Sequence, residues 1–127
     1  KVLLPKKGKK DKLFSWKLSK RYDQDISTLS LAAKVTLDKG QSFENITLSA
    51  GGVGPTPLIL QKTGKLLKKT NLSFSQSALQ TAINHDISPI SDLRGTARYR
   101  STAMVGLIKK MQRSLISGEK QNSIMSI

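Results

Sequence analysis

The stretch Ser27–Ala50 has the sequence STLSLAAKVTLDKGQSFENITLSA, and it decides the fold. In its first half every second side chain is apolar, at Leu29, Leu31, Ala33, Val35 and Leu37. Polar and small residues occupy the positions between them, which is typical of a strand buried on one face. Turn-forming residues follow at Asp38–Gln41, and the alternation resumes at Ile46, Leu48 and Ala50. The stretch therefore predicts an antiparallel hairpin over residues 28–51.

Upstream, Phe14 and Trp16 alternate with polar residues and predict one more short strand. Downstream the apolar period changes to that of helices. We expect a helix from Pro57, capped by Thr56, to about Lys69. A second helix is expected from the capping box Ser73–Gln76 to about Asp86, with Ser73 as its N-cap.

A third, long helix carries an apolar stripe from Ala97 to Leu115 and ends at Ser117–Gly118. Strands followed by helices predict an α+β fold. We expect a small antiparallel sheet of three to four strands, covered by three helices in a two-layer sandwich. The 127 residues suffice for one such domain.

The composition excludes several kinds of site. The chain has no cysteine and one histidine, so it holds no thiolate nucleophile, iron–sulfur cluster or histidine-rich metal site of its own. His85, beside Asp86, fits a structural role at a helix end better than that of a general base. No apolar run approaches the roughly 18 residues of a membrane-spanning helix, and we expect a cytoplasmic protein.

The formal net charge of +14 raises the alternative of a stand-alone basic module that binds nucleic acid or another polyanion. The lysines are spread over Lys6–Lys12, Lys62–Lys69 and Lys109–Arg113 rather than gathered on one recognition helix. This distribution favours solvated faces, and we do not expect nucleic acid as the partner.

Three segments carry candidate binding residues. RYDQDIST, at Arg21–Thr28, either presents mixed charge to a polar cofactor or is a solvated entry to the strand. DISPISDLRGTARYR, at Asp86–Arg100, either binds an anion through its arginines or fastens its own loop to the domain. AGGVGPTP, at Ala50–Pro57, either cradles a phosphate at a helix start or only turns the chain.

The order of these segments resembles a known family. DQDIS, the strand–turn–strand, AGGVGPTP before a helix, and DISPISDLRGTARYR before a long helix are similar to the C-terminal subdomain of the flavoprotein component of molybdenum hydroxylases. That family includes xanthine dehydrogenase, aldehyde oxidase and carbon monoxide dehydrogenase. The resemblance covers about Val2 to Leu115. It implies a subdomain at residues 1–117, with 1–16 as a candidate junction to a preceding FAD-binding subdomain and 118–127 as a flexible tail.

The chain starts at Lys1 without Met, and we expect a longer protein around it. The resemblance implies an oxidoreductase that passes electrons from a molybdopterin centre through [2Fe–2S] clusters to FAD and then to an acceptor. The molybdopterin and the clusters would lie in partner domains or subunits, and preceding subdomains would supply most FAD contacts. The isolated piece would then be inactive.

By the same resemblance, the cofactor-binding residues of this chain are Lys17, Arg21, Gln24, Asp25 and Ile26. Lys17 matches a flavin-contacting lysine, and Gln24 stands where some members carry Asp. The DxRxxAxYR residues are expected to be structural: Asp92, Arg94, Tyr99 and Arg100. The glycines of AGGVGPTP are then expected to serve the turn, and no catalytic or metal-binding residue is expected here.

Overall fold

The predicted hairpin forms in the computed structural model as two nine-residue strands, β2 (Leu29–Leu37) and β3 (Phe43–Gly51). β1 (Asp11–Leu18) pairs antiparallel with β2, and the two-residue β4 (Leu58–Ile59) pairs antiparallel with β3. The order in the sheet is β1-β2-β3-β4. The residues that the structure describes are 1–21, 26–40, 42–71 and 73–118. The predicted flexible tail therefore lies outside them except for Gly118.

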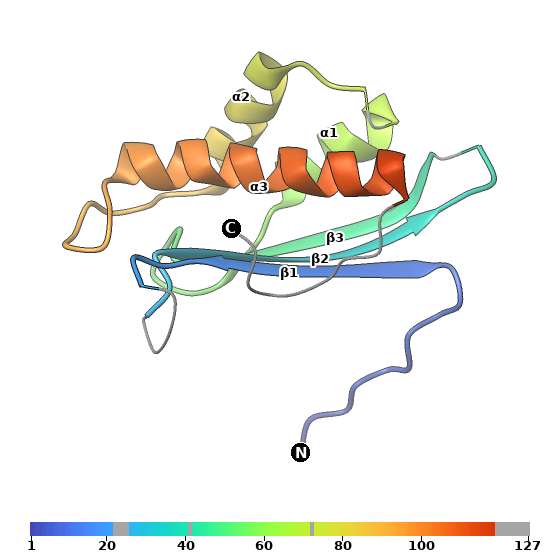
Figure 1. Ribbon diagram of the computed structural model, residues 1–127, viewed down its shortest axis with the longest axis horizontal. Helices are drawn as coiled ribbons and strands as arrows, with labels where there is room; N and C mark the ends of the chain where they lie inside the picture. The colour runs from blue at the N-terminus through green and yellow to red at the C-terminus, as the bar shows by residue number, and fades with distance from the viewer. Residues whose placement is uncertain (22–25, 41, 72, 119–127) are drawn as a thin grey trace.

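Three helices cover one face of this sheet: α1 (Gln61–Thr70), α2 (Gln76–Asp86) and α3 (Ala97–Ser117). α3 runs along the strands, α1 packs on β3, and α2 lies on the same side of the sheet against α1 and α3 (Figure 1). The predicted α+β sandwich of two layers is therefore confirmed.

The core lies between the two layers. In the sheet, Trp16 stands opposite Leu31, and Leu31 stands opposite Ala50, so that three strands contribute one buried row. α3 buries an apolar stripe against this face, including Met104 and Ile108. The alternation that predicted the strands thus points its apolar side chains at the helices.

The first helix begins later than the sequence predicted. Thr56 does not cap it, because Leu58 and Ile59 continue as β4 and the amide of Leu60 donates to the carbonyl of Leu48 at 2.9 Å. α1 starts only at Gln61, and no local side chain caps it. The cap comes from elsewhere in the fold, as described below.

The second helix is also displaced. The N-cap is Ser75 rather than Ser73, and its hydroxyl oxygen accepts from the amide of Ala78 at 3.1 Å. Both serines offer the same side chain to a following helix, so the pattern alone did not separate them. The predicted ends are confirmed: Asn71 follows α1 and Gly118 follows α3, each in the left-handed conformation.

Candidate functional site

Three loops meet at one end of the sheet, on the left in Figure 1. They are the described parts of the connection from β1 to β2 (residues 19–21 and 26–28), the connection from β3 to β4 (52–57) and the connection from α2 to α3 (87–96). Each of them overlaps one of the three segments that the sequence singled out for binding. Hydrogen bonds from one arginine fix their relative positions.

Arg100, in the first turn of α3, joins all three loops. Its Nη1 donates to the carbonyl oxygens of Thr28 and Gly52, both at 2.8 Å. Its Nη2 donates to Oδ1 of Asp92 at 2.6 Å and forms an ion pair there. The arginine is 4% exposed, so these bonds are made where water is largely excluded. The predicted fastening role of Asp92 and Arg100 is confirmed.

Asp92 also closes the turn that precedes α3. Its Oδ1 accepts from the amides of Arg94 at 2.9 Å and Gly95 at 3.2 Å. These bonds, the one from Arg94 foremost, and the nearby Arg100 guanidinium hold the pKa of the Asp92 carboxyl below its ordinary value. The charged carboxylate is therefore the form that the turn stabilises.

Two further bonds tie the β1–β2 connection to this turn. Lys20 Nζ donates to the carbonyl of Leu93, and Thr28 Oγ1 donates to the carbonyl of Arg94 at 3.2 Å. Arg94 contributes its backbone to the turn while its side chain is exposed, and Tyr99 is exposed as well. The expected structural roles are therefore seen for Asp92, for Arg100 and for the backbone of Arg94.

The predicted cofactor-binding residues lie at this end. Lys17 is half-buried near the end of β1, and Arg21 is exposed just after it. Ile26 returns toward β2 with 64% of its surface exposed. Gln24 and Asp25 lie outside the described residues. The described part of the predicted set thus places the cations of Lys17 and Arg21 and the exposed apolar Ile26 at this end.

Beside Lys17 the sheet is nearly bare on the face without helices. Lys17 stands opposite Ser30, and Ser30 stands opposite Gly51. A Cβ added to Gly51 would come within 2.6 Å of Ser30 Oγ, so the position favours a residue without a side chain. Ser30 and Gly51 thus form a low, bare shelf next to Lys17. A flat polar group could approach the strands closely at this shelf.

The glycines of AGGVGPTP serve the turn. Gly52 has a φ of 75°, and a Cβ there would lie 2.5 Å from the carbonyl oxygen of Thr28. Glycine is required for this conformation and this close approach. Its carbonyl is one of the two that Arg100 binds.

A phosphate cradle at the following helix does not form. The amides of Lys62 and Thr63, at the start of α1, donate to the carboxylate of Asp86 at 2.9 and 2.7 Å. Thr63 Oγ1 donates to the same carboxylate at 2.8 Å. The position that an anion would take at this helix start is filled by a side chain from the end of α2.

The match to a family of known proteins covers most of the chain. Residues 14–115 match the model of the CO dehydrogenase flavoprotein C-terminal domain. The chain belongs to this family. The kinship with the C-terminal flavoprotein subdomain of molybdenum hydroxylases, inferred from the ordered segments, is confirmed.

Individual proteins that the chain resembles point to the same family. Over 103 residues the chain is 29% identical to the putative xanthine dehydrogenase FAD-binding subunit XdhB of Escherichia coli, covering 80% of this chain and 34% of that one. A solved structure of reconstituted CO dehydrogenase from Oligotropha carboxidovorans superposes with a TM-score of 0.73 at 25% identity, covering 89% of this chain and 40% of that one.

A CO dehydrogenase from Hydrogenophaga pseudoflava shares the fold, with a TM-score of 0.69 at 23% identity over 84% of this chain and 37% of that one. That structure lacks the Mo-pyranopterin moiety of its molybdenum cofactor. This member of the flavoprotein C-terminal family thus spans about a third of the length of its curated relative from Escherichia coli.

The described residues offer neither a metal site nor a membrane-spanning helix. They contain no group of three or more His, Cys, Asp or Glu that could hold a metal ion. None of their helices is long and apolar enough to cross a membrane. Sequence reasoning found the candidate loops but missed that Arg100 joins them, because its two carbonyl partners lie 72 and 48 positions away.

Proposed function

We propose that this domain closes one side of an FAD site in the flavoprotein component of a xanthine dehydrogenase-like molybdenum hydroxylase. The observation that carries the proposal is the end of the sheet where Lys17 stands next to the bare shelf of Ser30 and Gly51, with Arg21 and the exposed Ile26 in the adjoining connection. The domain boundaries 1–117, with 1–16 as junction, stay part of the proposal. A cytoplasmic location is proposed with it.

The residues at this end fit a flavin edge. When bound, FAD would accept electrons and pass them to an acceptor. The ammonium of Lys17 would favour the added negative charge, and Ile26 would cover an apolar surface against water. Gln24 and Asp25 would complete the loop, with the neutral amide of Gln24 adding no negative charge beside the ring.

We assign the remaining parts of the enzyme to other domains or subunits. Preceding FAD-binding subdomains would hold most of the cofactor, and partners would carry molybdopterin and [2Fe–2S] clusters that deliver electrons to FAD. Arg100 supports the proposed site indirectly, because it fixes the loop that carries Ile26 through the carbonyl of Thr28. The isolated chain is expected to be inactive.

The test is flavin potentiometry on the full-length flavoprotein. Lys17→Met should lower the FAD midpoint potential, because a cation that stabilises the reduced flavin is removed. Gln24→Asp should lower it too, because it adds a negative charge. Lys12→Met, a change to an exposed lysine of the same strand, serves as the control.

Equal potentials for the wild-type protein and both site variants would refute the assignment of these residues. A full-length protein without flavin absorbance would refute the function itself. Steeply salt-dependent RNA binding by that protein would then favour the basic module as the alternative.

A further inference from the structure

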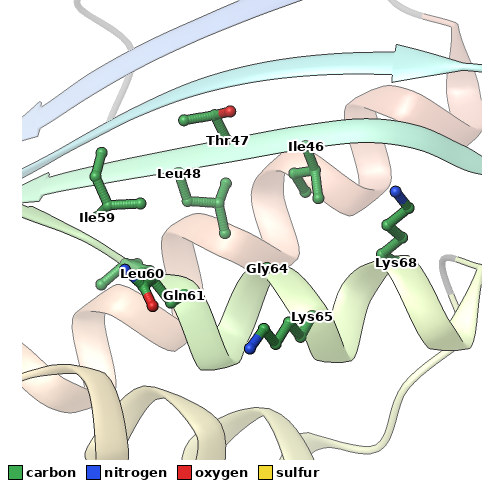
Figure 2. A pocket seen from close by; sticks show the side chains of 9 residues that line it. All are labelled: Ile46, Thr47, Leu48, Ile59, Leu60, Gln61, Gly64, Lys65 and Lys68. Carbon is green, nitrogen blue, oxygen red and sulfur yellow. The ribbon is translucent and has the colours of Figure 1, made fainter.

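A groove runs between α1 and the edge of the sheet formed by β3 and β4, on the helix-covered side of the molecule. Its volume is about 260 Å³. Ile46, Leu48, Ile59 and Leu60 supply its apolar lining. Two lysines of α1 also line it: Lys68 points toward the sheet, and Lys65 lies along the helix (Figure 2). Ile59 is 53% exposed, so part of this apolar surface faces the solvent.

Gly64 keeps the groove open on the helix side. It lies within α1 and lines the groove, and a Cβ built on it would meet no other atom within 4 Å. A helix interior disfavours glycine relative to alanine. Neither a positive φ nor a close neighbour within the described chain requires glycine here. The space left by the missing side chain is therefore available to an occupant from outside.

The charge of α1 and the volume of the groove restrict the kind of molecule that could occupy it. α1 has the sequence QKTGKLLKKT, with four lysines and no acidic residue, and these lysines are exposed. An acidic partner is favoured by this charge, whereas a second copy of a chain with a net charge of +14 is repelled. The volume is below the roughly 300 Å³ at which whole small-molecule ligands are usually enclosed. One or two apolar side chains of a protein fit it better than a cofactor does.

We propose that this groove docks an acidic segment of another subunit or domain of the same oxidoreductase, which inserts an apolar side chain over Gly64. This inference rests on the proposed function, because that function supplies the partner. The apolar contact with the exposed Ile59 and the half-buried Ile46 would bind the segment, and the lysines of α1 would orient it and speed its association.

The experiment compares two glycines of the full-length flavoprotein, co-expressed with the iron–sulfur and molybdopterin subunits. Gly64→Leu fills the groove. Gly106→Leu is the matched control, because Gly106 also lies within a helix, is exposed, and has no atom within 4 Å of an added Cβ. The dissociation constant of the flavoprotein from its partner subunits is measured by sedimentation, and FAD content by absorbance.

We expect Gly64→Leu to weaken assembly by about tenfold or more, with unchanged FAD content, and Gly106→Leu to match the wild type. Reversing Lys65 and Lys68 to glutamate should also weaken assembly and remove its salt dependence. The same reversal at Lys9 and Lys10, in the exposed N-terminal segment, should have little effect.

Wild-type affinity in Gly64→Leu would overturn the docking proposal. If Gly64→Leu changed only the self-association of the flavoprotein, the occupant would be a second copy and the proposal would be overturned. If deleting residues 119–127 reproduced the effect, the occupant would be this chain's own tail, which would overturn the proposal as well. A wild-type flavoprotein that assembles but holds no FAD would contradict the proposed function alone. The comparison of the two glycine variants would still decide the role of the groove.

Discussion

Asp86→Ala tests how the helical layer is held together. Asp86 ends α2, and its carboxylate accepts from the amides of Lys62 and Thr63 and from the Thr63 hydroxyl, all at 2.7–2.9 Å. It therefore supplies the N-cap of α1 from 23 to 24 positions away. Removing it leaves the start of α1 without partners and leaves the buried Thr63 hydroxyl unsatisfied.

The loss can be estimated from these contacts. Each amide bond to the half-buried carboxylate contributes about 1 kcal/mol, and stranding the Thr63 hydroxyl costs about 1 kcal/mol more. The interaction with the helix dipole adds about 0.5 kcal/mol. The free energy of unfolding should thus fall by about 3.5 kcal/mol. For a domain of this size that corresponds to a melting temperature lower by roughly 10–15 °C.

The assay is thermal and urea unfolding of the chain followed by circular dichroism. Asp38→Ala is the control, because Asp38 also accepts two amide bonds, from Gly40 and Ser42, but in an exposed turn. We expect that change to cost about 1 kcal/mol or less.

A double-mutant cycle with Thr63→Val isolates the hydroxyl bond. Thr63→Val should cost about 1 kcal/mol alone and almost nothing once Asp86 is alanine. A loss below about 0.5 kcal/mol in Asp86→Ala, or strict additivity in the cycle, would refute the remote cap.

Three further predictions concern the loops and charges. Arg100→Ala should lower the free energy of unfolding by about 2–5 kcal/mol, since the buried carbonyl of Thr28 and the partly buried carbonyl of Gly52 lose their donor; loss of FAD from the full flavoprotein without a lower melting temperature would contradict its structural role. Gly52→Ala should cost at least about 2 kcal/mol because of its positive φ, whereas Gly106→Ala should stabilise by about 0.5–1 kcal/mol; urea unfolding of both variants distinguishes the two effects. The pKa values of Asp11 and Asp92 are lowered by folding, so their contribution to stability is complete above the ordinary value of 3.8 and is lost as the pH falls through the folded values. Asn at both positions should reduce the acid-induced loss, as urea unfolding at pH 3 and pH 6 would measure.

The layers of the fold were predictable because they depend on local periodicity. Alternating residues placed β2 and β3 correctly, and the apolar stripe placed α3 from Ala97 to Ser117. The start of α1 was not predictable, because its cap is a carboxylate from another helix and Thr56 offers a plausible local substitute. Local patterns carry no information about a partner so distant along the chain.

The candidate site was predictable to a similar degree. The ordered segments identified the family and the loop from Lys17 to Ile26, which the structure places at one end of the sheet. The bare shelf beside Lys17 depends on the register that brings Ser30 opposite Gly51, and no single segment specifies that register. The bonds from Arg100 to carbonyl oxygens were equally hidden, because any residue type has a carbonyl.

The binding of Arg100 to main-chain carbonyl oxygens affects how the sequences of such domains can diverge. The two bonds that Arg100 makes to main-chain oxygens do not themselves depend on the side chain of the accepting residue. The carbonyl of residue 28 would remain if its side chain were exchanged, whereas the arginine and its partner Asp92 are needed for their side chains. Loops anchored in this way can change in sequence and still follow the same path.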